Sequence, residues 1–237
     1  LTDQSPRDHH RPMRLLDLAT LPHVDAEAAV RRAAYVFLPV NPVEYHGPHL
    51  SLRNDALISR GLAPLLAAAL GEDEVVIASD VEVGVDPCPG PGTRHTTLPA
   101  ALGLVREAAR ALAELGARRI VLITFHGAPL HAAMLEDVAR ELRASGVGAV
   151  APLGRVLESM LAFSGPGPYA ASVKHLDDQS GARVLARLGT DFHAGFFETS
   201  LSLAPAPHSV ADVRLSLPAC PAFEHGRRTR GLGAPAR

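Results

Sequence analysis

The stretch RIVLITFHG, residues 119–127, decides the fold class. Residues 119–125 are almost continuously apolar and rich in β-branched side chains, which predicts a strand buried on both faces. A histidine and a glycine follow at once, so a side chain suited to chemistry stands where the strand ends. Such strands are typical of parallel sheets that helices cover on both faces.

Strands and helices alternate outward from this stretch. The apolar patterns predict further strands at 35–40, 75–78 and 147–153, and helices at 26–34, 55–70, 99–115, 130–144, 181–188 and 199–203. We therefore expect an α/β fold, a three-layer sandwich around a mostly parallel, doubly wound sheet.

The domain organisation follows from length and local composition. The 237 residues suit one large domain. We expect a loose N-terminal arm over 1–20, a single domain over 21–225 and a flexible C-terminal tail over 226–237. The stretches 84–99 and 164–180 are expected to be loops.

Composition excludes several classes of function. The formal net charge is -2, so no basic field supports nucleic-acid binding. No phosphate-binding glycine motif of a nucleotide cofactor site is present. Cys88 and Cys220 are too few for a disulfide framework or a cysteine zinc site. The apolar runs are too short to span a bilayer and the start lacks a signal-peptide core, so we expect a cytoplasmic protein without membrane partners.

Candidate metal ligands follow the predicted strand at 35–40, in the sequence NPVEYHGPHL of residues 41–50. Glu44 and His46 lie just beyond that strand, where open parallel sheets bind ligands. Their i, i+2 spacing directs both side chains to one side of an extended backbone. Asp55 opens the next helix and can face the same crevice. Such a ligand set suits Zn²⁺, Mn²⁺ or Fe²⁺ more than Ca²⁺. The alternative is a polar loop, with Glu44 solvated and His46 capping backbone groups.

Three further candidates lie in two other segments, one after the central strand and one nearer the C-terminal end. His126 ends the central strand, although a histidine there is often only a hydrogen-bonded loop residue. Later, His193 and Glu198 flank a bendable Ala-Gly pair. A glutamate directly after two phenylalanines is costly to bury unless it is paired or binds metal. The alternative for Glu198 is a residue that complements a helix dipole.

Together these motifs resemble the creatininase (creatinine amidohydrolase) family. The resemblance rests on three motifs in order, over roughly residues 35–205: EYHGPHL at 44–50 with Asp55 after it, HG at 126–127, and HAGFFETS at 193–200. Each motif alone is weak, but their co-occurrence is specific. The resemblance implies a creatininase-like fold and a homo-oligomer, a hexamer in typical members.

The resemblance also implies a site with two divalent metal ions, with Zn²⁺ expected first and Mn²⁺ or Fe²⁺ as alternatives. Asp55 would bridge both ions. Glu44 and His126 would complete the shell of one ion, and His46 and Glu198 that of the other. In the creatinine-cleaving branch a glutamate two residues after the strand-end histidine is a ligand. Ala128 holds that place here, so Glu198 takes the role, as in other members.

Two departures bear on the substrate. The family usually has Asn-Gly-His-Gly-Gly-Asn, whereas this chain has TFHGAP at residues 124–129. The asparagines that would orient a substrate are therefore missing. Creatinine-cleaving members close tryptophans over the ring, and this chain has no Trp. Creatinine is therefore not the expected substrate.

The expected activity is hydrolysis of an amide-type carbon–nitrogen bond, cyclic or linear, in a small molecule. Two ions would supply a metal-bridging hydroxide. His193 would give the leaving nitrogen a proton, with Glu198 as a second catalytic residue. Three alternatives stay open: a metal-binding member that has lost catalysis, a metallophosphoesterase or other dinuclear hydrolase, and a ligand-binding protein without metal. Arg53 and Arg94 are the basic residues near the motifs, which is little for a phosphate cage.

Overall fold

A parallel sheet forms the centre of the molecule. The structure is a computed structural model that describes residues 13–161, 171, 173–187, 191 and 193–218. Within these residues, five strands are hydrogen-bonded in the order β1-β3-β2-β4-β5, and every pair is parallel. The strands are β1 (Arg14–Asp17), β2 (Val36–Pro39), β3 (Glu74–Ile77), β4 (Arg119–Ile123) and β5 (Gly148–Val150).

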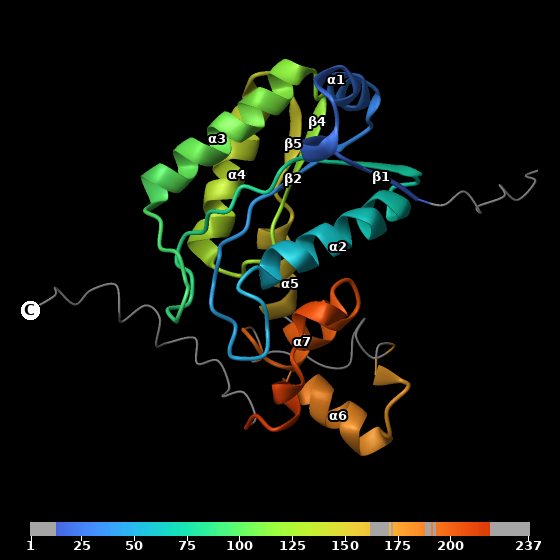
Figure 1. Cartoon of the computed structure of the whole chain (residues 1–237), viewed down its shortest axis with the longest axis vertical. Coiled ribbons are helices and arrows are strands. Elements are labelled where there is room, and N and C mark those ends of the chain that lie inside the picture. The colour runs from blue at the N-terminus through green and yellow to red at the C-terminus, as the bar shows by residue number, and fades with distance from the viewer. Residues whose placement is uncertain (1–12, 162–170, 172, 188–190, 192, 219–237) are drawn as a thin grey trace, which may run out of the picture.

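Helices cover both faces of this sheet (Figure 1). The α-helices of the described residues are α1 (His23–Arg32), α2 (Asn54–Ala69), α3 (Leu98–Leu115), α4 (Pro129–Ala144), α5 (Leu153–Leu161), α6 (Asp178–Arg187) and α7 (Phe196–Leu203). Short 3-10 turns are η1 (Leu18–Thr20), η4 (Pro207–Ser209) and η5 (Asp212–Leu215). None of the helices in this part of the chain is long and apolar enough to cross a membrane.

Alternation along β2 and β4 builds the two cores. Leu38 and Leu122 point to the face covered by α1, α3 and α4, where they join a large apolar cluster. Phe37 and Val121 point to the opposite face, where Ala63 and Ala67 of α2 pack against them. Both faces are buried, so β2 is apolar throughout and β4 is apolar from Ile120 to Ile123. The predicted three-layer α/β sandwich is confirmed.

The connections leave a crevice between the ends of β2 and β4. After β2, the chain runs through α2 on one face of the sheet and returns as β3, the neighbour of β2 on the side away from β4. It leaves β4 through α4, on the opposite face, to reach β5 on the other side. The loops after β2 and β4 therefore diverge, as at the switch points where doubly wound sheets bind ligands.

Three predictions about the elements need correction. The prediction of a loose arm over 1–20 is wrong for residues 14–20, because β1 pairs with β3 and is followed by η1. The strand expected at 147–153 is only Gly148–Val150, because α5 begins at Leu153. The C-terminal helical piece begins at Phe196 and not at 199. Residues 1–12 and 219–237 lie outside the described residues, as do residues 164–170 and 172 of the loop expected at 164–180.

Candidate metal centre

The segment after β2 carries the first candidates into the crevice. The Glu44 amide donates to the Leu52 carbonyl oxygen at 2.9 Å, which folds residues 44–52 into a closed loop. Gly47 turns this loop with a φ of 76°, a conformation that glycine adopts without steric cost. Asp55 follows in the first turn of α2, facing the same interior.

One asparagine fixes the end of β2 against the end of β4. The Asn41 Oδ1 atom accepts hydrogen bonds from Phe125 N at 3.0 Å, Thr124 Oγ1 at 3.1 Å and Ser59 Oγ at 3.0 Å. His126, the next residue of the chain, is thereby held beside the segment that carries Glu44. Asn41 is buried, and no motif in the sequence indicated its role.

The third segment needs a glycine for a close approach. The Asp191 side chain lies over Gly195 and accepts from Phe197 N at 3.2 Å, so it satisfies an amide in the first turn of α7. A Cβ on Gly195 would lie 1.6 Å from Asp191 Oδ1, so any residue other than glycine would clash with this carboxylate. Ala194 has a φ of 54°, and its amide donates to Glu198 Oε2. This turn directs Glu198 inward. The hydrogen bond from the Ala194 amide also agrees with the alternative that Glu198 complements the N-terminus of α7.

All five predicted ligands converge in one buried cluster. His46 Nε2 lies 3.1 Å from Asp55 Oδ1 and 3.8 Å from Glu198 Oε2. His126 Nδ1 lies 2.9 Å from Glu44 Oε2 and 3.7 Å from Asp55 Oδ2. None of the five residues is more than 4% exposed. The Asp55 carboxylate thus faces both histidines, one oxygen toward each.

His193 stands at the mouth of the cluster. Its Nδ1 lies 3.9 Å from Glu44 Oε1, and its ring lies 4.4 Å from the His46 ring between centroids. Its side chain is 26% exposed, whereas those of Glu44 and His46 are 1% exposed. His193 is therefore the histidine of this group that solvent or a substrate can reach.

Backbone carbonyl oxygens orient the three histidines. His46 Nδ1 lies 3.0 Å from Glu44 O, His126 Nε2 lies 2.9 Å from Val85 O, and His193 Nε2 lies 2.9 Å from Tyr45 O. A carbonyl only accepts, so each of these nitrogens is the protonated one. The other nitrogen of each ring faces the carboxylates: it can donate to them while the ring is protonated, and it offers its lone pair to a cation when the ring is neutral. Metal-binding histidines are commonly oriented in this way.

The family model for "Creatininase: Creatinine amidohydrolase" matches residues 19–233. The chain belongs to the creatininase family. No curated protein sequence matches it.

Solved creatininase-family structures share its fold. A crystal structure of creatinine amidohydrolase (creatininase) is 24% identical with a TM-score of 0.56, and the match covers 82% of this chain and 74% of that one. A putative creatinine amidohydrolase from Bacteroides fragilis is 16% identical with a TM-score of 0.59, and the match covers 94% of this chain and 79% of that one. A creatininase described as the Mn form is 22% identical with a TM-score of 0.55, covering 85% and 76%. Other similar structures are described as a Zn-Zn type and as a complex with creatine.

Charge balance in this creatininase-family cluster is maintained by protons when no metal ion is bound. Burial alone would lower the pKa of His46, but its hydrogen bond to Asp55 and the nearby Glu198 charge raise that pKa to about 10. Burial also opposes charge on His126, yet the contact with Glu44 raises the pKa of His126. Burial raises the pKa of Glu198 well above its ordinary value. Buried carboxylates that recruit protons in this way are suited to hold cations.

The metal-free protein should therefore lose stability as the pH rises. His46 holds its proton more tightly in the folded protein than in the unfolded chain. The resulting stabilisation is complete below about pH 6.5 and is lost as the pH rises through about 10. The raised pKa of Glu198 acts in the same direction. Thermal unfolding after chelation should show a falling melting temperature across this interval.

A matched pair of variants tests whether His46 causes this loss of stability with rising pH. His46→Gln should flatten the decline, whereas the same change at the exposed His208 should leave it in place. A melting temperature of the metal-free protein that is constant or rises over this interval contradicts the expectation.

Besides Asn41, two residues at this site were not predicted from the sequence. His131 in α4 is fully buried, and its ring lies 5.1 Å from that of His126. Burial lowers the pKa of His131 to about 3, so it is neutral and accepts from Val85 N at 3.4 Å. Its position five residues after His126, on the inward face of α4, was the available signal. Cys88 is the second missed residue.

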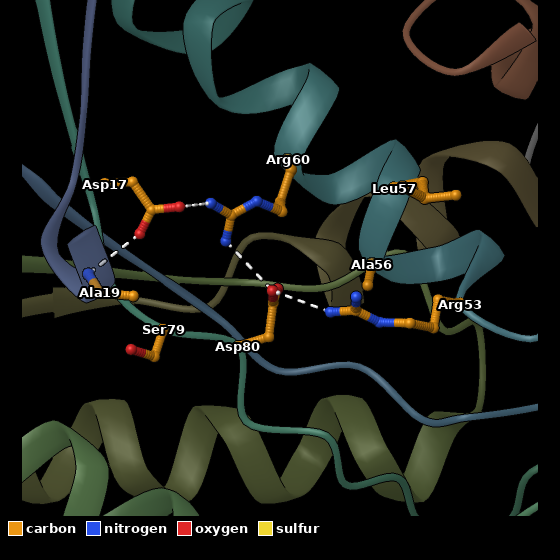
Figure 2. Close-up of a pocket in the computed structure, with 8 residues that line it drawn as sticks. All are labelled: Asp17, Ala19, Arg53, Ala56, Leu57, Arg60, Ser79 and Asp80. Carbon is orange, nitrogen blue, oxygen red and sulfur yellow. Dashed lines mark hydrogen bonds and ion pairs between the residues drawn. The ribbon is translucent and has the colours of Figure 1, made fainter. Parts of the chain in front are cut away.

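A separate pocket lies beside α2 and is lined by Asp17, Arg60 and Asp80 among others (Figure 2). It contains about 370 Å³, and its charged side chains pair with one another. Arg60 contacts Asp17 and Asp80, and Arg53 lies 3.2 Å from Asp80 and 2.9 Å from Glu82. Helical periodicity places Arg53 and Arg60 roughly opposite Asp55 on α2. These arginines therefore do not line the metal cluster.

Proposed function

We propose that this protein is a metal-dependent amidohydrolase that cleaves an amide-type carbon–nitrogen bond in a small molecule. The observation that carries the proposal is the position of the Asp55 carboxylate, with Oδ1 3.1 Å from His46 and Oδ2 3.7 Å from His126. Asp55 Oδ2 is buried and has no hydrogen-bond partner among the described residues. A buried, unsatisfied carboxylate oxygen between two further donor groups is well placed to share two cations.

The donor set fits two divalent ions. Glu44, Asp55 and His126 have ligand atoms within 4.8 Å of one another, as do His46, His193 and Glu198. Carboxylate oxygens and imidazole nitrogens suit Zn²⁺, and also Mn²⁺ or Fe²⁺. The manganese and zinc forms of similar creatininases support this assignment.

When bound, such ions lower the pKa of a water molecule and polarise an amide carbonyl. Glu44, Asp55 and Glu198 would hold the ions and balance their charge. His193 moves the proton. Because its Nε2 is held by Tyr45 O, its Nδ1 is the nitrogen that takes a proton from the attacking water. The same Nδ1 then donates that proton to the leaving nitrogen, because an amide anion leaves poorly. Burial and the neighbouring His46 lower the pKa of His193, which keeps Nδ1 available as a base.

The substrate is proposed to be a small cyclic or linear amide other than creatinine. The chain has no Trp to cover a creatinine ring, and Ala128 stands where the creatinine-cleaving branch has a ligand. We also propose a homo-oligomer, on the family resemblance alone.

The arginines favour an amidohydrolase over a phosphoesterase. Arg53 and Arg94 both contact Glu82, Arg53 Nε at 2.9 Å and Arg94 Nη1 at 3.0 Å. These two arginines therefore form ion pairs with Glu82, which is not part of the metal cluster. A phosphate-binding cage needs such guanidinium groups directed at the substrate.

The test combines metal analysis with a substrate panel. The purified protein should contain two divalent ions per chain. It should release amine or ammonia from at least one cyclic or linear amide, and chelation should lower that rate at least about 100-fold. Zinc or manganese should restore it. A metal-loaded protein that is inactive on the panel favours a member without catalysis, and one that cleaves only phosphate esters favours a phosphoesterase.

A further inference from the structure

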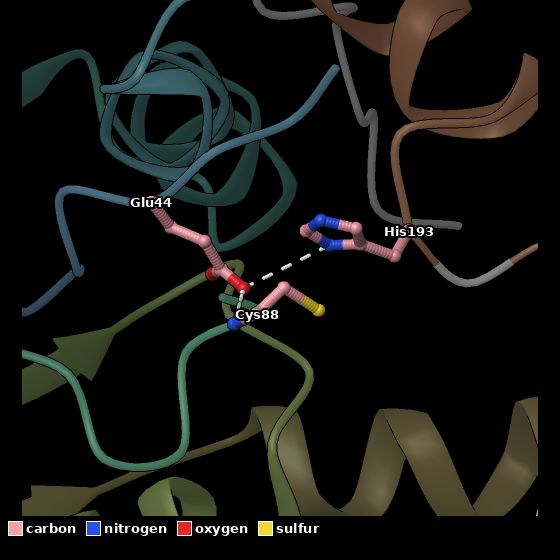
Figure 3. Close-up of side chains that lie close together, drawn as sticks. All are labelled: Glu44, Cys88 and His193. Atoms are coloured by element: carbon pink, nitrogen blue, oxygen red, sulfur yellow. Dashed lines mark hydrogen bonds and ion pairs between the residues drawn. The ribbon is translucent and has the colours of Figure 1, made fainter. Parts of the chain in front are cut away.

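The loop between β3 and α3 brings a sulfur atom to the metal cluster. Figure 3 shows the Cys88 side chain beside the Glu44 carboxylate and the His193 ring. Ligand-type atoms of these three residues all lie within 4.8 Å of one another. Glu44 and His193 belong to the site described above, whereas no motif gave Cys88 a role. Cys88 adds a soft donor to a set otherwise made of oxygen and nitrogen atoms.

Cys88 is held in this position by its backbone. Pro87 and Pro89 flank it and restrict its conformations. Its amide donates to Glu44 Oε1, and its carbonyl oxygen accepts from Thr93 Oγ1 at 2.9 Å. The same Thr93 oxygen accepts from Tyr45 N at 2.9 Å. The loop is thus tied to the segment that carries Glu44, so the approach of the thiol is built into the fold.

The neighbouring carboxylate independently indicates a cation. Glu44 is 1% exposed, and its Oε2 lies 2.9 Å from His126 Nδ1. Among the described residues, Glu44 Oε2 and Asp55 Oδ2 are both buried oxygens without a hydrogen-bond donor. Such oxygens are costly unless a positive charge lies next to them.

We propose that Cys88 binds, through its sulfur, the metal ion that Glu44 holds, and so tunes the metal preference of this chain. The proposal rests on the proposed function, since it needs an ion at Glu44. On binding, the S–H bond breaks, its proton passes to water, and the sulfur electron pair forms the metal–sulfur bond. Nothing is oxidised or reduced. Thiolates favour Zn²⁺ over Mn²⁺, so Cys88 selects zinc at this position.

The test reads the metal–sulfur bond directly. The full chain is stripped with a chelator and reloaded with Co²⁺ as the probe. Wild type should show a near-ultraviolet thiolate-to-cobalt charge-transfer absorption. Cys88→Ser should lose it while binding two Co²⁺ at excess metal, and Cys220→Ser, the matched control, should keep it. The zinc-over-manganese affinity ratio of Cys88→Ser should fall at least about tenfold.

X-ray absorption of the zinc-loaded wild type needs no variant and guards against a misfolded one. It should show one sulfur at about 2.3 Å. Two bound ions without sulfur in their shell overturn the role of Cys88 and leave the proposed function intact. No bound metal at all overturns both. A metal-loaded protein whose Cys88 is alkylated as fast as in the metal-free form also overturns the proposal.

Discussion

Asp55→Asn is expected to lose both metal ions and to lower amide hydrolysis by at least about 1,000-fold. Asparagine has the size of aspartate, so the buried cluster keeps its shape. The neutral amide, however, cannot balance two cations, and only one of its two terminal atoms is an acceptor. Among the described residues, Asp55 is the carboxylate whose two oxygens face both histidines, 3.1 Å from His46 and 3.7 Å from His126. Removing its charge therefore weakens both halves of the site together.

Elemental analysis and kcat/KM measure this effect, with circular dichroism to verify folding. The control is Asp178→Asn, a change at an exposed aspartate in the first turn of α6. It should leave metal content and activity unchanged. If Asp55→Asn, or the harsher Asp55→Ala, keeps both ions and full activity, then the site has been misplaced.

His193→Ala is expected to keep both ions but to lower kcat by about 100- to 10,000-fold, the usual range for a lost proton-transfer group. His193 lies at the mouth of the cluster, 3.9 Å from Glu44, and is more exposed than the other ligand-type histidine beside it, His46. The loss should shrink for amides with a more acidic leaving nitrogen, because that nitrogen needs less protonation. A merely structural residue would not produce this dependence on the leaving group.

Metal content separates two roles for His193, since its ring also lies within ligand distance of His46 and Glu198. A His193→Ala protein that loses one ion assigns the residue as a ligand and contradicts the proton-transfer role. One with unchanged kcat removes the residue from the chemistry altogether. His175→Ala changes an exposed histidine in the turn before α6 and is the matched control.

Local signals were enough for the centre of the sheet and for the candidate ligands. The continuous apolar runs of β2 and β4 have few other solutions in a chain of this size. Residues placed directly after such strands meet at one edge of a parallel sheet, so Glu44, His46 and His126 could be placed together. Glu198 depended on the family motif, because no periodicity relates α7 to the sheet.

The missed features depend on contacts between distant segments. β1 is a short edge strand whose Leu15 is 52% exposed, so its sequence lacks the apolar pattern of a buried strand. Its pairing with β3 is a tertiary effect that propensity does not carry. Cys88 reaches the cluster because Thr93 joins two loops through hydrogen bonds. The hydrogen bonds that Asn41 accepts from Ser59, Thr124 and Phe125 likewise depend on the fold and leave no pattern in the sequence.

The convergence of three widely separated segments also makes the cluster a cross-link. Residues 44–55, His126 and Glu198 come from the first, middle and last parts of the described chain, and Ser202 of α7 adds a hydrogen bond of 2.6 Å to Asn54 of α2. Ions that bind the folded protein and not the unfolded chain would stabilise it in proportion to their affinity. They would also fasten α7 to the edge of the sheet, much as a disulfide closes a long loop. Aromatic residues make up only 4% of this chain, so few large side chains are available to hold α7 by packing. The residues proposed to bind the ions would then also anchor this helix.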